Sequence, residues 1–352
     1  LQDLASLHRS HFTFPVIGIT GTNGKTTTKE LIAAVLSKKY HCLSTQGNLN
    51  NHIGVPLTLL RIRPDTGIAV VEMGANHPGE IGALCRIARP DFGIITNIGK
   101  AHLAGFGSFE GVIAAKRDLY DHIRHEGKML FVNLDDDLLV SLADGIPQVA
   151  YSRTKPSPCR GTLVSADPFV VMDIHTGGGL HLSSHLFGGY NADNILAAAC
   201  IGDHFGVPAS LIKEAIEGYV PSNNRSQVVR GKKNLLIMDA YNANPGSMHA
   251  ALQNFAQSAL PGKMVILGDM LELGAESENE HREIIRMVAE LGFTNAVFIG
   301  PVFSSLLKDS PVEAFETSDA AKEFLLKHEI TGRTILVKGS RGTRLEQVED
   351  AL

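Results

Sequence analysis

A glycine-rich segment between an apolar run and a helical run carries the clearest chemistry in this chain. It reads Gly18-Ile-Thr-Gly-Thr-Asn-Gly-Lys25-Thr26-Thr-Thr. Glycines let backbone N–H groups approach phosphate oxygens, a helix start carries partial positive charge, Lys25 adds a cation, and the Thr26 hydroxyl can bind magnesium. The strict phosphate-loop spacing would place glycine at position 19, where the chain has Ile19. Because a strand is expected over 14–19 and a helix over 26–36, the segment still predicts use of a nucleoside triphosphate.

Three polar side chains follow later apolar runs and are candidates for the same site. Glu72 ends the run Val70-Val71-Glu72, where it either holds a hard cation beside Thr26 or is a solvated acid. His102 follows a strand expected over 93–96, and a surface or core histidine is the alternative. Lys116 lies on a helix expected over 112–123, which by itself indicates a solvated helix face. A buried lysine with a depressed pKa, however, can be neutral and react with carbon dioxide to give an anionic carbamate.

The second half of the chain places further candidates at turns. Asp239 opens the turn Asp239-Ala240-Tyr241-Asn242-Ala243-Asn244, where it either binds a ribose hydroxyl pair or caps a helix. Arg225 can reach a phosphate if two domains close over a nucleotide. The loop Lys338-Gly339-Ser340-Arg341 follows the last expected strand, and a charged surface turn explains it equally well.

Composition excludes several function classes. A formal net charge of -5 gives no basic field of the kind that nucleic-acid binding needs. The four cysteines form no C-x-x-C pair, which excludes a zinc cage or a disulfide framework and suits a reducing compartment. No apolar run reaches the roughly 20 residues that span a bilayer. We therefore expect a soluble, cytoplasmic protein without nucleic-acid or membrane partners.

The pattern of elements predicts two α/β domains, in line with a length of 352 residues. Short β-branched runs alternate with amphipathic stretches over 16–132, and period-2 alternation over 162–187 indicates an appended antiparallel hairpin. A Gly-, Pro-, Ser- and Asn-rich linker is expected over 218–224, and the alternation restarts at 235. We expect an ATP-binding domain with a mostly parallel sheet over 1–222, and a Rossmann-like α/β domain over 223–352.

Taken together, these segments resemble the Mur ligase family, the ATP-dependent C–N ligases of peptidoglycan assembly, over the whole chain. The resemblance implies that Lys25, Lys116 and His102 are catalytic, and that Lys116 is carbamylated. It also implies two magnesium ions, held by Thr26, Glu72, His102 and Lys116. The residues implied to contact ATP are Gly21, Thr22, Asn23, Gly24, Lys25, Thr26 and Thr27 at the phosphates, Asn194 at the adenine, Arg225 at the phosphates and Asp239 at the ribose.

Within that family the chain is similar to the members that add D-alanyl-D-alanine. The segments that carry this similarity are 47–51, 72–77, 240–245, 267–274 and 338–341. It implies UDP-N-acetylmuramoyl-tripeptide and D-alanyl-D-alanine as substrates of a monomeric enzyme. The family enzyme also has an N-terminal domain for the uridine nucleotide, and this chain starts just before the ATP domain, so we expect that domain to be absent here. The residues implied to bind the substrates are Asn50, Asn51, Tyr241, Asn242, Asn244, Lys338 and Ser340.

The implied reaction activates a carboxylate before an amine attacks it. Transfer of the γ-phosphoryl group of ATP gives an acyl phosphate, and charge on the transferring group is neutralised by Lys25, loop amides and magnesium. Three alternatives stay open at this point. They are a sister amide ligase or folate polyglutamylating enzyme, a phosphate-loop kinase or ATPase, and an ATP-binding fragment that is inactive without an N-terminal domain.

Overall fold

The computed structural model describes residues 1–222 and 224–352, which form two compact units. Unit 1 consists of Leu1–Val164, Val171–Ser184 and Tyr190–Tyr219, and unit 2 of Ser165–Val170, His185–Gly189 and Val220–Leu352. The linker expected over 218–224 includes Asn223, which lies outside the described residues.

The first sheet has nine strands, in the order β2-β3-β1-β4-β5-β6-β7-β8-β9. Pairing is parallel from β2 through to β7. As far as β6, a crossover containing a helix returns the chain to the same end of the sheet after each strand. The carboxyl ends of these strands therefore share one edge. The strands are β1 (Val16–Thr20), β2 (Cys42–Ser44), β3 (Ile68–Glu72), β4 (Phe92–Ile95), β5 (Met129–Asn133), β6 (Gln148–Ser152), β7 (Cys159–Ser165), β8 (Phe169–Thr176) and β9 (Gly178–Phe187).

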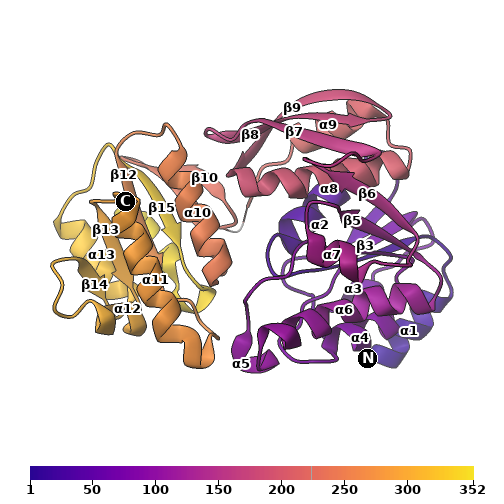
Figure 1. The fold of residues 1–352 in the computed structure, drawn as a ribbon, viewed down its shortest axis with the longest axis horizontal. Coiled ribbons are helices and arrows are strands. Elements are labelled where there is room, and N and C mark those ends of the chain that lie inside the picture. The colour runs from indigo at the N-terminus through magenta and orange to yellow at the C-terminus, as the bar shows by residue number, and fades with distance from the viewer. Residues whose placement is uncertain (223) are drawn as a thin grey trace. The chain divides into compact units, whose positions relative to one another are not determined.

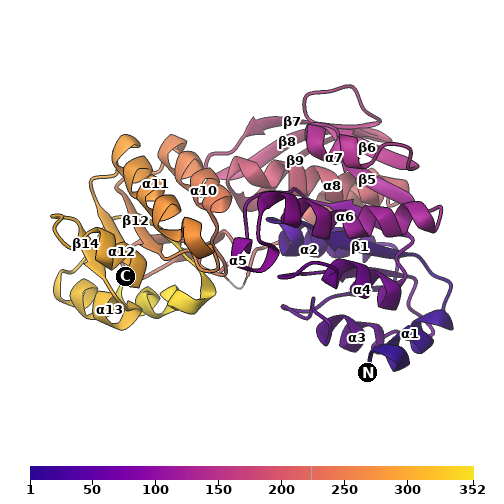
Figure 2. The ribbon, with the colours of Figure 1, turned by 60° about the horizontal axis from the view of Figure 1, so that its bottom comes forward.

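Helices cover both faces of this sheet. α2 packs against α8 on one face, and α4 packs against α6 on the other (Figure 1). α1, at the start of the chain, packs beside α3 and α4 (Figure 2). The helices are α1 (Gln2–Ser10), α2 (Lys25–Leu36), α3 (Gly54–Leu59), α4 (Glu80–Ala88), α5 (Leu103–Phe106), α6 (Phe109–His125), α7 (Asp137–Leu142), α8 (Ala192–His204) and α9 (Ala209–Glu217).

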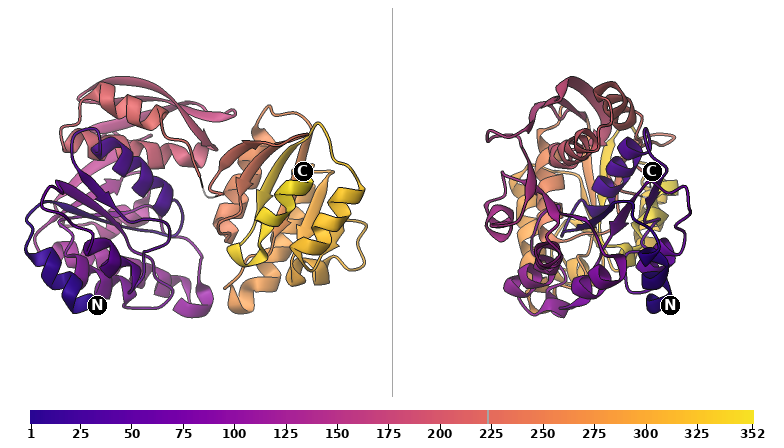
Figure 3. Two further views of the ribbon diagram at one scale, coloured as in Figure 1. Left: turned by 180° about the vertical axis from the view of Figure 1, so that it is seen from behind. Right: turned by 90° about the vertical axis from the view of Figure 1, so that its right-hand side faces the viewer.

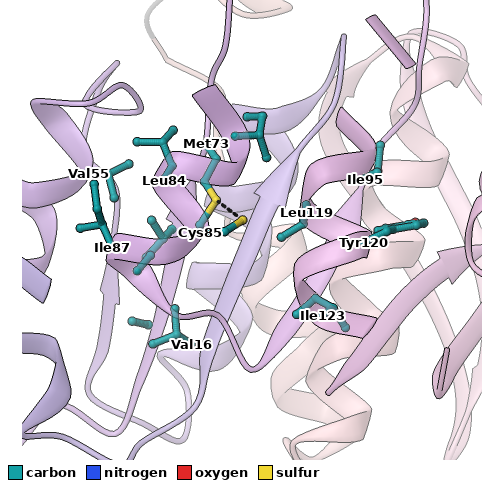
Figure 4. Close-up of a cluster of buried hydrophobic side chains, with 14 of the residues drawn as sticks. Val16, Val55, Met73, Leu84, Cys85, Ile87, Ile95, Leu119, Tyr120 and Ile123 are labelled. Atoms are coloured by element: carbon teal, nitrogen blue, oxygen red, sulfur yellow. Dashed lines mark hydrogen bonds between the residues drawn. The ribbon is translucent and has the colours of Figure 1, made fainter. Parts of the chain in front are cut away.

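A buried apolar cluster fixes α4 and α6 against the strands (Figure 4). Val16, Leu84 and Leu119 belong to it and are almost completely buried. Gly18 permits the close approach, because a Cβ at this position would lie 3.2 Å from Leu119 Cδ1 and 3.3 Å from Met73 Cε. This packing sets the position of α6, the helix that carries Lys116.

The appended hairpin predicted from the period-2 pattern is present. β8 and β9 are neighbours in the sheet and are joined by Gly177 alone, so the chain must reverse direction between them. Gly177 has φ +33°, and its backbone approaches Asp203 closely. Along β9, alternate residues are buried and exposed, as expected for a strand with one covered face.

Unit 2 contains a doubly wound sheet in the order β10-β11-β15-β12-β13-β14, parallel except for the antiparallel β10. Helices cover both faces of this sheet (Figure 3). Val265 and Leu267 of β12 belong to the apolar cluster that includes α10 and α11, whereas Met264 and Ile266 belong to the one that includes α13. The fold class expected from the sequence is therefore confirmed. The elements are β10 (Gln227–Arg230), β11 (Leu235–Asp239), α10 (Pro245–Gln257), β12 (Lys263–Gly268), α11 (Ser277–Glu290), β13 (Ala296–Ile299), α12 (Pro301–Leu306), β14 (Glu313–Phe315), α13 (Ser318–Lys327) and β15 (Thr334–Lys338).

Among the described residues, no helix combines the length and the apolar character needed to cross a bilayer.

Candidate active site

The glycine-rich segment forms the loop between β1 and α2. Gly24 is the N-cap of α2 with φ +78°, a left-handed conformation that favours glycine. Gly21 has φ +149° and packs so closely on Thr96 that a Cβ would overlap the Thr96 side chain. The residues after β4 hold the loop, since Asn97 accepts from the backbone N–H groups of both Thr22 and Asn23 at 2.9 Å. A helix start directly behind such a loop presents backbone N–H groups to an anion.

Two lysines from different helices converge on this loop. Lys25 Nζ donates to Gly21 O at 2.7 Å and to Thr22 O at 3.0 Å. Lys116 Nζ, from α6, donates to the same Gly21 oxygen at 3.0 Å. Burial, and to a smaller extent the charge of Lys25, lowers the pKa of Lys116 to about 7. Near neutral pH a large share of Lys116 is therefore an uncharged amine, the form that reacts with carbon dioxide.

A buried carboxylate lies beside the phosphate loop, at the end of β3. Glu72 Oε2 accepts from Thr26 Oγ1 at 2.9 Å, and Oε1 accepts from Asn50 Nδ2 at 2.8 Å. Glu72 is only 1% exposed, and no ion pair among the described residues includes it. A buried carboxylate with neutral partners is stabilised by a cation, and carboxylate and hydroxyl oxygens are donors that magnesium prefers. These residues thus fit a magnesium ion.

The structure places His102 on the segment after β4, at the same edge of the sheet. His102 directly precedes α5 and has φ +52°. Its ring packs edge-to-face against Phe106, with the two ring centroids 6.4 Å apart. Residues 1–222 and 224–352 contain no group of three or more His, Cys, Asp and Glu side chains that could hold a metal ion. Of the four predicted metal ligands, Glu72 and His102 belong to these residue types. That Thr26, Glu72, His102 and Lys116 together hold magnesium stays a prediction.

Sequence reasoning missed the residues that support Glu72. Its backbone N–H donates to Thr45 Oγ1 at 3.0 Å, and Lys29 Nζ donates to Thr45 O at 2.8 Å. Lys29 is almost completely buried. The available signal was its spacing, because Lys29 follows Lys25 by four residues and so shares its face of α2.

Asn50 and Asn51 were both predicted to place a substrate, and the structure separates them. The Asn50 side chain donates to Glu72, and the backbone carbonyl of Asn50 accepts from Gly74 N at 2.8 Å. Asn51 Oδ1 instead accepts from the backbone N–H groups of Ile53 and Gly54, at 3.1 and 2.9 Å. The Asn51 side chain therefore holds the turn that leads into α3, whose N-cap residue is Ile53.

Asn194, the residue predicted to contact adenine, lies near the start of α8. It is 8% exposed, and its side chain is bonded to Thr28 of α2 and to Asn191. The neighbouring Asp193 forms a two-point ion pair with Arg153, at 2.7 and 3.3 Å. The start of α8 is thus held to α2 on one side and to the residue after β6 on the other.

In unit 2, predicted site residues gather at the carboxyl ends of β11 and β15. Asp239 and Lys338 are neighbours in the parallel register, and Lys338 Nζ donates to Asp239 Oδ2 at 2.6 Å. Asp239 Oδ1 accepts from Ser226 N at 3.2 Å. Lys338 is buried, so its charge is paired within the protein. Asp239 therefore lies in the turn expected from the sequence, already bonded to a lysine.

The other unit 2 candidates have distinct surroundings. The Arg225 guanidinium stacks on the Tyr241 ring at 3.5 Å, and Arg341 lies 5.6 Å from the same ring. Asn242 is exposed. Asn244 caps α10 through a capping box with Ser247. The buried Ser340 accepts from Leu271 N at 3.0 Å, which connects the 338–341 loop to the 267–274 loop.

The 267–274 loop is organised by a buried aspartate and histidine. Asp269 accepts from the backbone N–H groups of Val302 and Phe303, at 2.9 and 3.0 Å. His281 Nε2 accepts from Met270 N at 3.0 Å, while Nδ1 lies 2.6 Å from Ser277 O and donates to it. This tautomer is neutral. Burial lowers the pKa of His281, against the opposing effects of Ser277 and Asp269.

The His281 arrangement predicts a loss of stability in acid. The folded state favours neutral His281. The contribution of His281 to the free energy of unfolding is therefore fully present above the ordinary pKa of 6.5 and is lost as the pH falls below it. We expect the free energy of unfolding of the wild type to fall below pH 6.5 more steeply than that of His281→Gln, by at most about 1.4 kcal/mol per pH unit. Urea unfolding between pH 8 and pH 5 measures this slope. The exposed His175→Gln is the control, and equal slopes for His281→Gln and wild type would contradict the prediction.

The phosphate loop, the buried Glu72 and the converging lysines define a nucleotide-dependent α/β enzyme. Two family models match the chain: "Mur ligase middle domain" over residues 19–202 and "Mur ligase, glutamate ligase domain" over residues 224–341. The chain belongs to the Mur ligase family.

Its relatives carry a more specific name. The UDP-N-acetylmuramoyl-tripeptide--D-alanyl-D-alanine ligase of Bacillus subtilis is 34% identical over 99% of this chain and 78% of its own length. The ligase of the same name from Escherichia coli is 35% identical over 99% of this chain and 79% of its own length. A crystal structure of MurF from Acinetobacter baumannii is similar with a TM-score of 0.89 and 33% identity, over 99% of this chain and 78% of that one. The Thermotoga maritima MurF, crystallised with ADP, has a TM-score of 0.87 and 26% identity, over 99% of this chain and 81% of that one.

Proposed function

We propose that this chain is the ATP-dependent ligase that joins D-alanyl-D-alanine to UDP-N-acetylmuramoyl-tripeptide in peptidoglycan precursor synthesis. The observation that carries the proposal is the similarity to D-alanyl-D-alanine ligases over 99% of the chain, together with a phosphate loop that faces Glu72 and Lys116. Because ATP is the energy source, we place the reaction in the cytoplasm. We assign residues 1–222 to the central ATP-binding domain and residues 223–352 to the C-terminal Rossmann-like ligase domain.

The residues around the phosphate loop would transfer the γ-phosphoryl group of ATP to the tripeptide carboxylate. Backbone N–H groups at the start of α2 and the Lys25 ammonium would neutralise charge that develops on the transferring group. Lys25 is already held at the loop by Gly21 O and Thr22 O, so it reaches a phosphate with little reorganisation. The resulting acyl phosphate has a good leaving group, and the amine of D-alanyl-D-alanine displaces it to form the amide.

We propose that Glu72, Thr26, His102 and Lys116 hold two magnesium ions. Magnesium at this position would supply Lewis-acid stabilisation of the phosphates. Glu72 contributes a buried anionic oxygen, which Thr26 and Asn50 orient by hydrogen bonds. Lys116, as a carbamate, would contribute a second anionic ligand at the phosphate loop.

The predicted unit 2 roles are also part of the proposal. Asp239 binds the ribose of ATP and Arg225 its phosphates. Lys338 orients the Asp239 carboxylate through their ion pair. Among the other candidates, Asn244 and Asn51 serve substrate binding indirectly, since Asn244 caps α10 and Asn51 holds the turn before α3.

Phosphate release tests the proposed function directly. The chain is mixed with UDP-N-acetylmuramoyl-tripeptide, ATP with magnesium, and D-alanyl-D-alanine, and each component is omitted in turn. We expect phosphate and the pentapeptide product only when all three are present. Phosphate release without an acceptor would indicate an ATPase. Equal turnover with a single amino acid in place of the dipeptide would indicate a sister ligase.

A further inference from the structure

Helix α2 is joined to the end of β3, where Glu72 lies, by a direct hydrogen bond and by an indirect connection. The direct bond runs from Thr26 Oγ1, in the first turn of α2, to Glu72 Oε2 at 2.9 Å. One turn further along the helix, Lys29 Nζ donates to Thr45 O at 2.8 Å. Thr45 Oγ1 in turn accepts from Glu72 N at 3.0 Å, and Thr45 N donates to Val70 O at 3.1 Å. Lys29 therefore ties α2 to the strand that ends in Glu72.

The Lys29 ammonium is buried, which is uncommon for a lysine. Lys29 is 2% exposed, and its Nζ lies 3.4 Å from Glu30 Oε1. The other Glu30 oxygen accepts from Tyr219 OH at 2.6 Å. Burying an ammonium costs free energy unless it is paired and hydrogen-bonded, and an apolar side chain of similar length would fill the position without this cost. The fold itself therefore does not require the charge, which indicates that the ammonium serves the neighbouring site.

Magnesium is demanding about the placement of its ligands, because it requires nearly ideal octahedral geometry with oxygen atoms at about 2.0–2.1 Å. Thr26 and Glu72 come from different elements, so their separation depends on how α2 packs against β3. The bond from Lys29 to Thr45 holds the helix against the strand that carries Glu72. This contact prepares the hydroxyl and the carboxylate for a cation before the cation binds.

We propose that Lys29 is a positioning residue for the magnesium site, acting through Thr45 on Glu72. The inference rests on the proposed function in taking Thr26 and Glu72 as magnesium ligands and ATP as the nucleotide. Lys25 has a different place, since it donates to the phosphate loop itself. Loss of Lys29 should therefore weaken the part of ATP binding that depends on magnesium, and leave ATP binding without magnesium nearly unchanged.

Four variants separate this role from a general structural one. Lys29→Met removes the ammonium and keeps a stem of similar length that suits a buried position. Thr45→Val removes the acceptor of the Glu72 N–H with little change of shape, and Thr45→Ser, which keeps the hydroxyl, is its matched control. Lys39→Met is the control for Lys29→Met, because the exposed Lys39 also donates to backbone carbonyls, at 3.0 Å, just beyond the same helix.

The experiment measures the dissociation constant of ATP for the full chain, once with excess magnesium and once with EDTA. The ratio of the two constants is the gain in affinity that magnesium provides. We expect Lys29→Met and Thr45→Val each to lower this gain by about tenfold, as for other residues that orient a metal ligand. Combining them should cause little further loss, because both act on Glu72 by the same route.

The affinity for ATP in EDTA should stay within about twofold of wild type in every variant, and so should the magnesium-dependent gain of Thr45→Ser and Lys39→Met. Thermal unfolding of each variant checks that the fold is retained. An unchanged gain in Lys29→Met would overturn the inference, and if that variant does not fold, an unchanged gain in Thr45→Val would do the same.

Other outcomes distinguish the inference from the proposals on which it rests. Equal losses of ATP affinity with magnesium and with EDTA would overturn the inference, because that pattern assigns Lys29 to the phosphate loop instead of Glu72. A wild-type chain that binds ATP equally well with and without magnesium would overturn the proposed magnesium site, and the inference with it. A wild-type chain that binds no ATP would overturn the proposed function itself.

Discussion

Replacing Lys25 with methionine is expected to lower the turnover number of ligation by about 10²- to 10³-fold, or about 3–4 kcal/mol of transition-state stabilisation. Methionine keeps the length of the stem but removes the ammonium, which lies within hydrogen-bonding distance of Gly21 O and Thr22 O. That charge is useful chiefly when negative charge builds up on the transferring phosphoryl group. The loss should therefore appear in kcat more than in the KM for ATP.

A matched variant separates this effect from a general change of charge. Lys38 lies just beyond the same helix and forms an exposed ion pair with Glu214. Lys38→Met makes the same chemical change and should leave kcat within about twofold, since surface ion pairs contribute little. Should Lys25→Met keep its kcat and show only a raised KM, Lys25 would be a ground-state binding residue, contrary to the prediction.

The core of the candidate site could be predicted because it depends on short-range patterns. Apolar runs followed by helical stretches mark the ends of parallel strands, and those ends meet at one edge of a sheet. Glu72 was placed this way at the end of β3, and Lys116 on α6. The structure brings both to the phosphate loop, where Glu72 contacts Thr26 and Lys116 contacts Gly21.

Contacts that depend on how helices pack against each other could not be predicted. Thr28 and Asn194 are 166 residues apart, and only the packing of α2 on α8 brings them together. Thr45 accepts from the Glu72 backbone N–H through its hydroxyl, and Lys29 donates to the Thr45 backbone carbonyl, an acceptor that every residue type carries. Asn51 Oδ1 accepts from two backbone N–H groups just before α3, a local contact that the residue type alone does not reveal, and its role in substrate binding stays a prediction.

The shortest elements were missed for a related reason. β2, β14 and α3 have only three to six residues, which is less than two turns of a helix or two full periods of a strand. α12 is equally short, and it begins where Asp269 accepts from Val302 and Phe303. The 267–274 motif could therefore be recognised by its residues, whereas its buried contact with His281 required the structure.

Replacing Lys116 with alanine is expected to lower ligation by at least about 10³-fold and to be partly rescued by short carboxylic acids. Lys116 is buried beside Lys25, and its pKa is lowered to about 7, so the neutral amine is abundant at physiological pH. The neutral amine adds to carbon dioxide and releases a proton, which leaves an anionic carbamate. The truncated side chain removes this anion and opens space for a small carboxylate in its place.

The pH dependence gives a second measurement with a defined sign. Below pH 7 the amine is increasingly protonated and cannot add to carbon dioxide, so wild-type activity in bicarbonate-free buffer should fall as the pH drops from 8 to 6. Added bicarbonate should restore activity most strongly at the lower pH values. Lys116→Ala should show no response to bicarbonate, because it has no amine to modify.

Two controls make the rescue specific to an anion at this position. Acetate or formate should restore part of the activity of Lys116→Ala but none of that of Lys25→Met, where a cation is missing. Lys128 lies just after α6, is exposed and pairs with Asp91. Lys128→Ala should therefore retain wild-type turnover. If Lys116→Arg were active and carboxylates rescued nothing, Lys116 would act as a cation on Gly21 O. In that case Glu72, which contacts Thr26, would be the anionic side chain left to balance a divalent ion at the phosphate loop.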